Sequence, residues 1–322
     1  MRVMIKRTEL YDLAVELQEI SNNLEDINNY IDGYKYDETT NTYRVYSSQG
    51  ILDAFDNAEI SGTVENPATI VLMKDIELKA TKDKNGSAKY GILIESGKIT
   101  LDLNGYCLSA PDYIDSVIQI GVEWGELCEA VLTIEDNSID ESGKIFASYI
   151  GIYNQGGTLV FNNGTIEVNS PKGDWVAIGI NQYLGSFTMN SGSIIVNSVA
   201  TGWLTSGFGE DGPGGTVTIN GGYINVNGPV ASALYLRSNS YINGGTIECN
   251  DDHIGGTETI YLGTNEEGIG ATFIGGIRSH LTINSLLAEG IGYYDANGNL
   301  IEVSDDATEV LDKGDIIVKR IN

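Results

Sequence analysis

Neighbouring acidic residues are the side chains of this sequence whose type and spacing could do chemistry. Two carboxyl groups that flank a glycosidic bond can serve as general acid and as base or nucleophile in sugar hydrolysis. Examples of such groups are Glu210-Asp211, Glu266-Glu267 and Asp251-Asp252-His253. Adjacent residues on a strand point to opposite faces, so the two Glu-containing doublets form no ready-made pair, although carboxylates from neighbouring turns of a repeat could meet. We therefore interpret them as solvated turns and expect no catalytic residue.

Three aromatic residues offer binding chemistry instead. Trp175 and Trp203 are 28 residues apart, each six residues after the Asn of a Val-Asn-Ser motif, and Tyr113 falls near the same position one copy earlier. Exposed aromatic rings in a line can stack on sugar rings. They can equally be contacts between protomers or pack a loop onto the protein. We predict that Tyr113, Trp175 and Trp203 contact a glycan or another protomer.

A sequence repeat would have to align these residues. Each copy holds a short strand, a corner of Asn-Gly, Ser-Gly or Gly-Gly type, and a second short strand. The copies are KITLDLNGYCLSA from Lys98, GTLVFNNGTIEVNS from Gly157, GSFTMNSGSIIVNS from Gly185, GTVTINGGYINVNG from Gly215, SYINGGTIECND from Ser240 and ATFIGGIRSHLTINS from Ala271. Third short strands between the corners are IGIY from Ile150, AIGI from Ala177, SALYL from Ser232 and TIYL from Thr259.

Three short strands in a period of 23 to 31 residues predict a parallel β-helix. Inward Ile, Val, Leu and Phe would fill its bore, and each coil would rise by about 4.8 Å. Gly and Asn would occupy corners with positive φ, which other residues avoid. A propeller needs blades of about 40 residues, so the short period argues against one.

The flanking segments differ from the repeat. Residues 33–46 alternate Tyr with polar residues and predict a β-hairpin. Ile51, Leu52, Phe55 and Ala58 have helical spacing and predict a short helix that caps the solenoid. The tail has an Asn-Gly hairpin signal and a last strand. We divide the chain into residues 1–32, 33–66 (hairpin and capping helix), 67–286 (β-helix) and 287–322 (β cap).

An apolar heptad pattern marks residues 1–32. Its spacing is 3, 4, 3, 4, 3, 4, through Leu10, Leu13, Leu17, Ile20, Leu24, Ile27 and Ile31. Such a narrow apolar seam predicts an α-helical coiled coil, and Leu at a with Ile at d favours three or more strands. We expect a homotrimer. A single helix that packs on its own β-domain is the alternative.

Composition limits the partners and the cofactors. The 322 residues include 45 Asp or Glu and 18 Lys or Arg, for a net charge of -27, so nucleic acid is not an expected partner. The acidity indicates a solvated surface or one that binds calcium. Three widely spaced cysteines, Cys107, Cys128 and Cys249, indicate neither a disulfide framework nor a zinc site, and we expect them reduced in the core. We expect no cofactor, secretion signal or membrane insertion.

Over residues 40–320 the repeat resembles the pectate-lyase-like family of right-handed parallel β-helices. TYRVYSSQGILDAF, TIVLMKDIEL and KITLDLNGYCLS look like the lead-in of β-helical surface proteins of gut bacteria and their phages. The heptad segment resembles the attachment stalk of phage head or tail fibres. The family includes lyases, hydrolases, tailspikes and inert adhesins, so the fold alone selects no activity. Its hydrolase motifs NTD, DD with GHG, and RxK do not occur here as a set.

The expected protein is an all-β, right-handed parallel β-helix solenoid with an N-terminal coiled coil. The resemblance implies a structural fibre or decoration protein of a phage virion, at its head or tail. It would dock on the virion through its N-terminus and attach to surface carbohydrate without catalysis. A tailspike-like polysaccharide depolymerase and a bacterial cell-surface adhesin are the alternatives.

Overall fold

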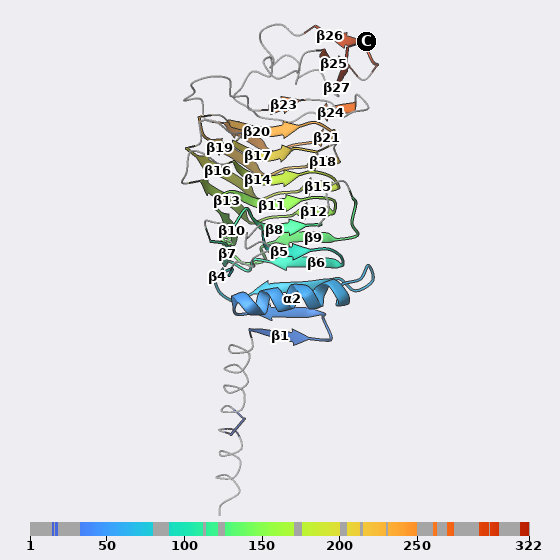
Figure 1. Ribbon diagram of the computed structural model, residues 1–322. Helices are drawn as coiled ribbons and strands as arrows, with labels where there is room; N and C mark the ends of the chain where they lie inside the picture. Colours follow the sequence, from blue (N-terminus) through green and yellow to red (C-terminus); the bar gives the residue numbers. More distant parts are fainter. Residues whose placement is uncertain are drawn as a thin grey trace, which may run out of the picture.

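Short strands, paired mainly in parallel, form most of the protein (Figure 1). The computed structural model describes residues 15, 17, 18, 33–79, 90–111, 114–121, 126–170, 176–199, 205–212, 215–229, 231–249, 260–262, 269–273, 290–295, 297–302 and 316–321. The described strands belong to three sheets, and successive strands pass from one sheet to the next except at the two ends of the chain. This order is that of a β-solenoid, and it confirms the predicted all-β repeat.

Sheet A is the largest of the three. In spatial order its strands are β1 (Tyr34–Asp37), β2 (Thr42–Val45), β3 (Ala68–Leu72), β6 (Lys98–Asp102), β9 (Val131–Glu135), β12 (Thr158–Phe161), β15 (Ser186–Met189), β18 (Thr216–Ile219), β21 (Asn239–Ile242), β24 (Ile269–Phe273), β27 (Ile316–Arg320), β25 (Ile291–Asp295) and β26 (Leu300–Ile301). From β2 to β24 every neighbouring pair is parallel. The pairs at both ends, which involve β1, β25, β26 and β27, are antiparallel.

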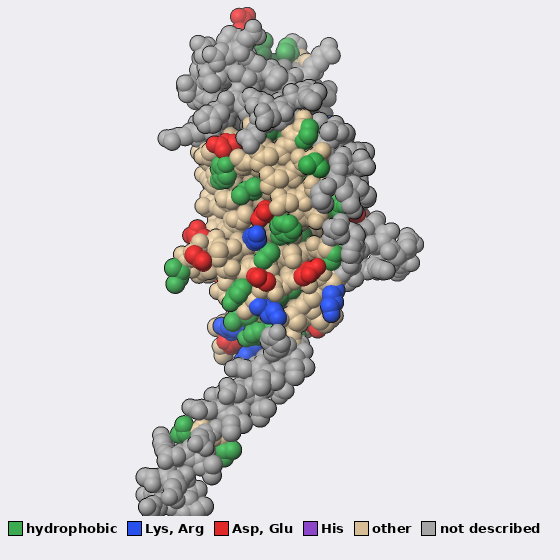
Figure 2. All heavy atoms as spheres, turned by 90° about the vertical axis from the view of Figure 1, so that its left-hand side faces the viewer, with side chains coloured by type: hydrophobic (Ala, Val, Ile, Leu, Met, Phe, Trp, Pro, Cys, Tyr) green, Lys and Arg blue, Asp and Glu red, His purple; other side chains and the backbone are tan. Residues whose placement is uncertain are grey.

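Sheets B and C are parallel throughout their described strands. Sheet B contains β4 (Ile76–Glu77), β7 (Cys107–Ser109), β10 (Lys144–Ala147), β13 (Thr165–Ser170), β16 (Ser193–Ser198), β19 (Tyr223–Asn227) and β22 (Thr246–Cys249). Sheet C contains β5 (Tyr90–Ile94), β8 (Ser116–Ile120), β11 (Ile150–Asn154), β14 (Ala177–Gln182), β17 (Thr205–Glu210), β20 (Ala231–Leu236) and β23 (Ile260–Leu262). Sheet B lies on the left in Figure 1 and faces the viewer in Figure 2.

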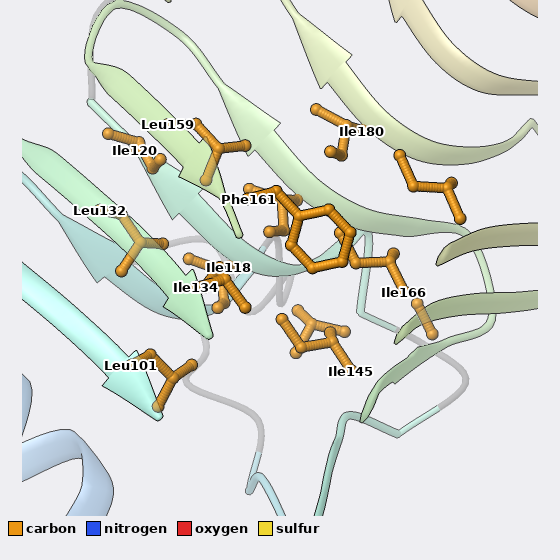
Figure 3. Packing of buried hydrophobic residues seen from close by; sticks show 14 of the residues in the cluster. Leu101, Ile118, Ile120, Leu132, Ile134, Ile145, Leu159, Phe161, Ile166 and Ile180 are labelled. Atoms are coloured by element: carbon orange, nitrogen blue, oxygen red, sulfur yellow. The ribbon is translucent and has the colours of Figure 1, made fainter. Parts of the chain in front are cut away.

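The core is the bore that the three sheets enclose. Strands of sheets A and B alternate buried apolar residues with more exposed ones, as in β12, where Leu159 and Phe161 are buried and Thr158 and Val160 are half-buried. In Figure 3 the labelled side chains from all three sheets point toward one another. Parallel register places Leu132, Leu159 and Phe187 in one column, because each inward residue lies over its counterpart in the next coil. The prediction that Ile, Val, Leu and Phe fill the bore is confirmed.

Glycine forms the corners between sheets A and B. Gly164, Gly192, Gly222 and Gly245 have φ of 90°, 82°, 97° and 106°, in the left-handed region that residues with a Cβ rarely adopt. A Cβ on Gly192 would also lie 2.8 Å from the carbonyl oxygen of Gly164 in the preceding coil. These corners match the prediction made from the repeat.

Outside the bore, asparagine amides form ladders along the solenoid axis. Beside sheet A, the Nδ2 groups of Asn190, Asn220 and Asn243 each donate to the Oδ1 of the asparagine in the preceding coil, at 2.9, 2.8 and 2.7 Å, and the series starts at Asn162. On sheet B, Asn169, Asn197 and Asn227 are linked in the same way, at 2.8 Å for each bond. Each amide inside a ladder therefore donates a hydrogen bond to one neighbour and accepts one from the other.

The predicted capping helix is α2 (Ser48–Ser61). Its N-cap is Ser47, whose side chain accepts a hydrogen bond from the backbone N–H of Gly50. Ile51, Phe55 and Ala58 are buried against the first coil, and Leu52 is half-buried. The hairpin predicted over residues 33–46 is the pair β1–β2, and the one predicted in the tail is the pair β25–β26.

Some parts of the repeat were not predicted from the sequence. The coil of β8, β9 and β10 lacks an Asn-Gly corner, and β5 and β17 do not continue the IGIY-type motif. Val15, Leu17 and Gln18 are helical, and Leu17 is 58% exposed. The other six heptad residues, Leu10, Leu13, Ile20, Leu24, Ile27 and Ile31, lie outside the described residues. Within the described part of the chain, no helix has the length and apolar character needed to cross a membrane.

Candidate functional site

The outer face of sheet C is less regular than the other two. Its strands keep a constant register, in which Ile150 pairs with Ile178 and Ile152 pairs with Ile180, but they interrupt the alternation of buried and outward residues at glycine. In β11 both Gly151 and Ile152 are buried. Beyond the glycine the buried isoleucines of neighbouring strands stack in the core, and the residue that follows each of them faces outward.

The outward residues of three successive strands form one column. Gln119 of β8 is the register partner of Tyr153 in β11, which is the partner of Asn181 in β14. Unlike the asparagine ladder of sheet A, this column places a different side chain on each coil. The polar groups of this column therefore cannot pair with an identical side chain in the next coil, as the asparagines beside sheet A do.

A pocket of about 380 Å³ lies over this column. That volume is within the usual range for small-molecule sites. The described lining residues are Asp115, Ser116, Gln119, Tyr149, Ile150, Tyr153, Gln155, Val176, Ile178, Asn181 and Asp211. They combine two tyrosine rings and three aliphatic side chains with amide, hydroxyl and carboxylate groups. Aromatic and aliphatic walls with a few polar groups are typical of pockets that hold a sugar.

Three polar atoms in the lining have no hydrogen-bond partner within the protein. They are Ser116 Oγ, Gln155 Oε1 and Asn181 Oδ1. Their residues are 2%, 5% and 5% exposed, so the atoms are nearly removed from bulk solvent. A buried polar group without a partner costs about 1–3 kcal/mol. Water or a ligand must therefore supply the missing bonds inside the pocket.

The amide orientations follow from partners that can only accept. Gln119 Nε2 donates to the carbonyl oxygen of Gly121 at 2.9 Å, and Asn181 Nδ2 donates to Asp211 Oδ2 at 3.2 Å. Since a carbonyl and a carboxylate oxygen accept hydrogen bonds, both amides must direct their nitrogen at these groups. The oxygen of Asn181 is thereby left without a partner in the protein.

Tyr153 supplies a neutral hydroxyl. Burial raises the pKa of Tyr153 above its ordinary value of 10.0, and the nearby Asp211 carboxylate raises it further. Gln155 donates a hydrogen bond to the phenol oxygen, which only partly offsets the rise in pKa. Tyr153 therefore keeps its proton near neutral pH, and its O–H group can donate a hydrogen bond to a ligand. No Lys, Arg or His is among the described residues that line the pocket.

The two carboxyl groups of the Glu210-Asp211 doublet point to opposite faces of sheet C, as predicted, but the interpretation of the doublet as a solvated turn is wrong for Glu210, which is buried at the end of β17. Asp211 is exposed and lines the pocket, whereas Glu210 is 1% exposed and points inward. Glu210 accepts hydrogen bonds from the backbone N–H groups of Arg237 and Ser238, at 2.5 and 2.9 Å, and from Ser238 Oγ. Burial raises the pKa of the Glu210 carboxyl, and these hydrogen bonds oppose the rise. Because the Glu210 carboxyl is buried, a polysaccharide at the surface cannot reach it.

Two carboxylates from different coils, Asp115 and Asp211, share the pocket. Asp115 precedes β8 and Asp211 follows β17, which lies three strand spacings further along sheet C. At about 4.8 Å per spacing, they are separated by about 14 Å along the solenoid axis. Retaining and inverting glycosidases hold their carboxyl groups about 5 to 9.5 Å apart. The separation does not suit either mechanism.

Most site residues predicted from the sequence lie outside the described residues. These are Tyr113, Trp175 and Trp203, together with Asp251, Asp252, His253, Glu266 and Glu267. In the sequence Trp175 directly precedes Val176, which lines the pocket. The pocket residues themselves were missed, because Gln119, Tyr153 and Asn181 become neighbours only when SVIQI, IGIYN and AIGINQ are aligned.

A second pocket of about 340 Å³ is lined by Tyr46, Ser47, Ser48, Gln49, Lys74, Asp75, Ile76, Glu77 and Lys79, and none of the buried polar atoms without a partner belongs to it. The described residues include no group of three or more His, Cys, Asp or Glu that could hold a metal ion. Cys107, Cys128 and Cys249 form no disulfide and are half-buried, so they lie nearer the surface than expected. On the face of sheet B, Figure 2 shows hydrophobic, acidic and basic side chains scattered among the other residues.

Comparison of the chain with known protein-family profiles, with curated proteins and with solved structures gave no match. Function must therefore be argued from the pocket and from the solenoid that carries it.

Proposed function

We propose that this protein is a non-catalytic attachment protein that binds surface carbohydrate through the pocket on sheet C. Its setting would be a phage virion, as a head or tail fibre or decoration protein. A right-handed parallel β-helix would serve as the shaft. The N-terminal heptad segment would form a trimeric coiled coil that docks on the virion.

One observation carries the binding proposal. Ser116, Gln155 and Asn181 place polar atoms without protein partners in a pocket walled by Tyr149 and Tyr153. Sugars match both features, because their hydroxyls exchange hydrogen bonds and their C–H faces pack on aromatic rings. The strands beneath hold these groups on a rigid wall, which reduces the ordering cost of binding.

The depolymerase alternative has one observation in its favour: Asp115 and Asp211 line the same pocket. Their axial separation of about 14 Å argues against a glycosidase pair. A lyase that uses another group stays open as the second candidate. The adhesin alternative predicts the same binding and differs in its location on a bacterial surface.

Glycan binding tests the proposal. The full chain would be applied to an array of neutral, uronate-containing, sulfated and amino-sugar oligosaccharides, and affinities for the bound members measured by calorimetry. Tyr153→Ala should weaken binding at least tenfold, because it removes one wall of the pocket and the hydroxyl. Tyr241→Ala removes a tyrosine of sheet A that is 38% exposed and should leave binding unchanged.

Enzymatic activity would appear in the same samples. A binding protein leaves each polysaccharide intact, whereas a depolymerase releases reducing ends or unsaturated sugars. Release that disappears in Asp211→Asn would establish the enzyme in place of the fibre. Equal loss of binding in Tyr153→Ala and Tyr241→Ala would place the binding site outside the pocket.

Light scattering tests the proposed trimer. The full chain should have the mass of three chains of 34.6 kDa each. Replacing Leu13, Leu17 and Leu24 together by Glu should convert it to a monomer, because charges would fall in the apolar seam. A monomeric full chain would remove the coiled coil from the proposal, and a variant that stays trimeric would move the protomer contacts to the β-solenoid.

A further inference from the structure

We infer that the pocket on sheet C favours neutral sugar residues over acidic ones, with Asp211 determining this specificity. The inference rests on the carbohydrate-binding function proposed above and names the class of sugar that the site takes.

The lining presents more acceptors than donors. The nitrogens of Gln119 and Asn181 are engaged by Gly121 and Asp211 within the protein. The oxygens of Asn181 and Gln155 have no protein partner, and the carboxylates of Asp115 and Asp211 can only accept. A ligand must therefore bring hydrogen-bond donors, which sugar hydroxyls do.

Two hydroxyl groups in the pocket can donate hydrogen bonds and therefore need acceptors on the ligand. Tyr153 holds its proton and receives a hydrogen bond from Gln155, so its O–H can still donate. Ser116 Oγ has no partner in the protein and can donate as well. A sugar hydroxyl accepts and donates at once, whereas an ammonium group only donates. Sugar hydroxyls therefore complement both the acceptors and the donors of the lining.

Charge disfavours acidic ligands. A carboxylate, sulfate or phosphate bound near Asp211 would meet a like charge, and no Lys, Arg or His is among the described lining residues. Anion-binding sites in proteins rely on such cations or on backbone N–H groups. The net charge of -27 adds a repulsive field of longer range.

The apolar walls of the pocket also suit a neutral sugar. Tyr149, Ile150, Val176 and Ile178 provide an aromatic and aliphatic surface beside the polar groups. The C–H face of an uncharged pyranose packs on such a surface without exposing an ionised group to it.

Paired probes test the inference. Galactan is compared with polygalacturonate, and dextran with dextran sulfate, together with any neutral sugar and its acidic counterpart found on the array. Neutral members should bind at least tenfold more tightly. In Asp211→Asn the difference should shrink by about tenfold, because one like charge is removed while the asparagine oxygen can still accept from Asn181.

A matched control removes the same charge elsewhere. Glu65→Gln changes an exposed residue of the loop that follows α2, and it should leave the preference for neutral sugars unaltered. Thermal unfolding of both variants checks that the fold persists.

The outcomes separate the two proposals. Equal or tighter binding of acidic members would overturn the inference while carbohydrate binding stands. An unchanged preference in Asp211→Asn, or an equal change in Glu65→Gln, would remove Asp211 as its cause. Binding of neither member of any pair would overturn the proposed function and the inference with it.

Discussion

The outer faces of sheets A and C are built on the same coil spacing but differ in how their polar groups are satisfied. Beside sheet A, Asn162, Asn190, Asn220 and Asn243 repeat one side chain, and each amide finds its partner in the next coil. On sheet C the equivalent column changes from coil to coil, and Asn181 Oδ1 has no partner in the protein. Where one side chain repeats, its polar groups pair with one another along the axis. Where the repeat is interrupted, polar groups remain that a ligand can bind.

The largest effect should come from the core that both faces share. Phe187 of β15 and Phe208 of β17 are buried and stacked, with ring centroids 5.0 Å apart, so the pair joins the inner sides of sheets A and C. Phe187→Ala should lower the free energy of unfolding by about 3–5 kcal/mol through the cavity it leaves. Urea unfolding measures this. Thr188→Ala, the outward neighbour, should cost far less, and equal losses would contradict the assignment of Phe187 to the core.

The two faces should respond oppositely to the same substitution. Asn190→Ala breaks hydrogen bonds to Asn162 and Asn220, and should cost about 1 kcal/mol of stability while leaving sugar binding intact. Asn181→Ala removes an oxygen without a protein partner together with the Nδ2 hydrogen bond to the exposed Asp211 carboxylate. Because the gain from the first offsets the loss of the second, stability should change by less than about 0.5 kcal/mol while binding falls at least tenfold. Urea unfolding and calorimetry measure the two quantities.

A mixed result would argue against this contrast. If Asn181→Ala destabilised the protein as much as Asn190→Ala and left binding unchanged, the column on sheet C would be structural. The pocket would then lose its main support.

The smallest effect concerns the inner side of sheet C. Burial raises the pKa of Glu210, so folding favours its protonated form. Its contribution to stability is therefore greatest at low pH and is lost as the pH rises from the ordinary value of 4.5 through the raised pKa. Glu210→Gln should stabilise the protein relative to wild type at pH 7, and the difference should shrink as the pH approaches 4.5.

Urea unfolding over a pH series measures this difference. A difference between wild type and Glu210→Gln that is constant with pH would mean that Glu210 titrates normally.

The sequence predicted the features that depend on local pattern. Alternating apolar residues placed Leu159, Phe161 and Phe187 in the bore, and Gly164 and Gly192 marked the corners. These features recur in each coil because the same steric limits apply to each one. The hairpin over residues 33–46 and the helix α2 also followed from local spacing.

The pocket could not be predicted in the same way, since it depends on register between strands that share no motif. Gln119 and Tyr153 are 34 residues apart, whereas Tyr153 and Asn181 are 28 apart, so no fixed period brings all three together. Strand β8 is buried at every position and shows no alternation. The search for large aromatic residues selected Trp175 and Trp203, although the described lining relies on tyrosine and amide groups.

The contrast between the faces also limits how such a gene can change in length. Duplication of one coil would extend the asparagine ladder by one more bond, since each amide needs only its immediate neighbours. The same duplication between β11 and β14 would separate Tyr153 from Asn181, which are register partners. The shaft can therefore lengthen by unequal recombination at most coils, while the coils of the pocket must be inherited together and in order.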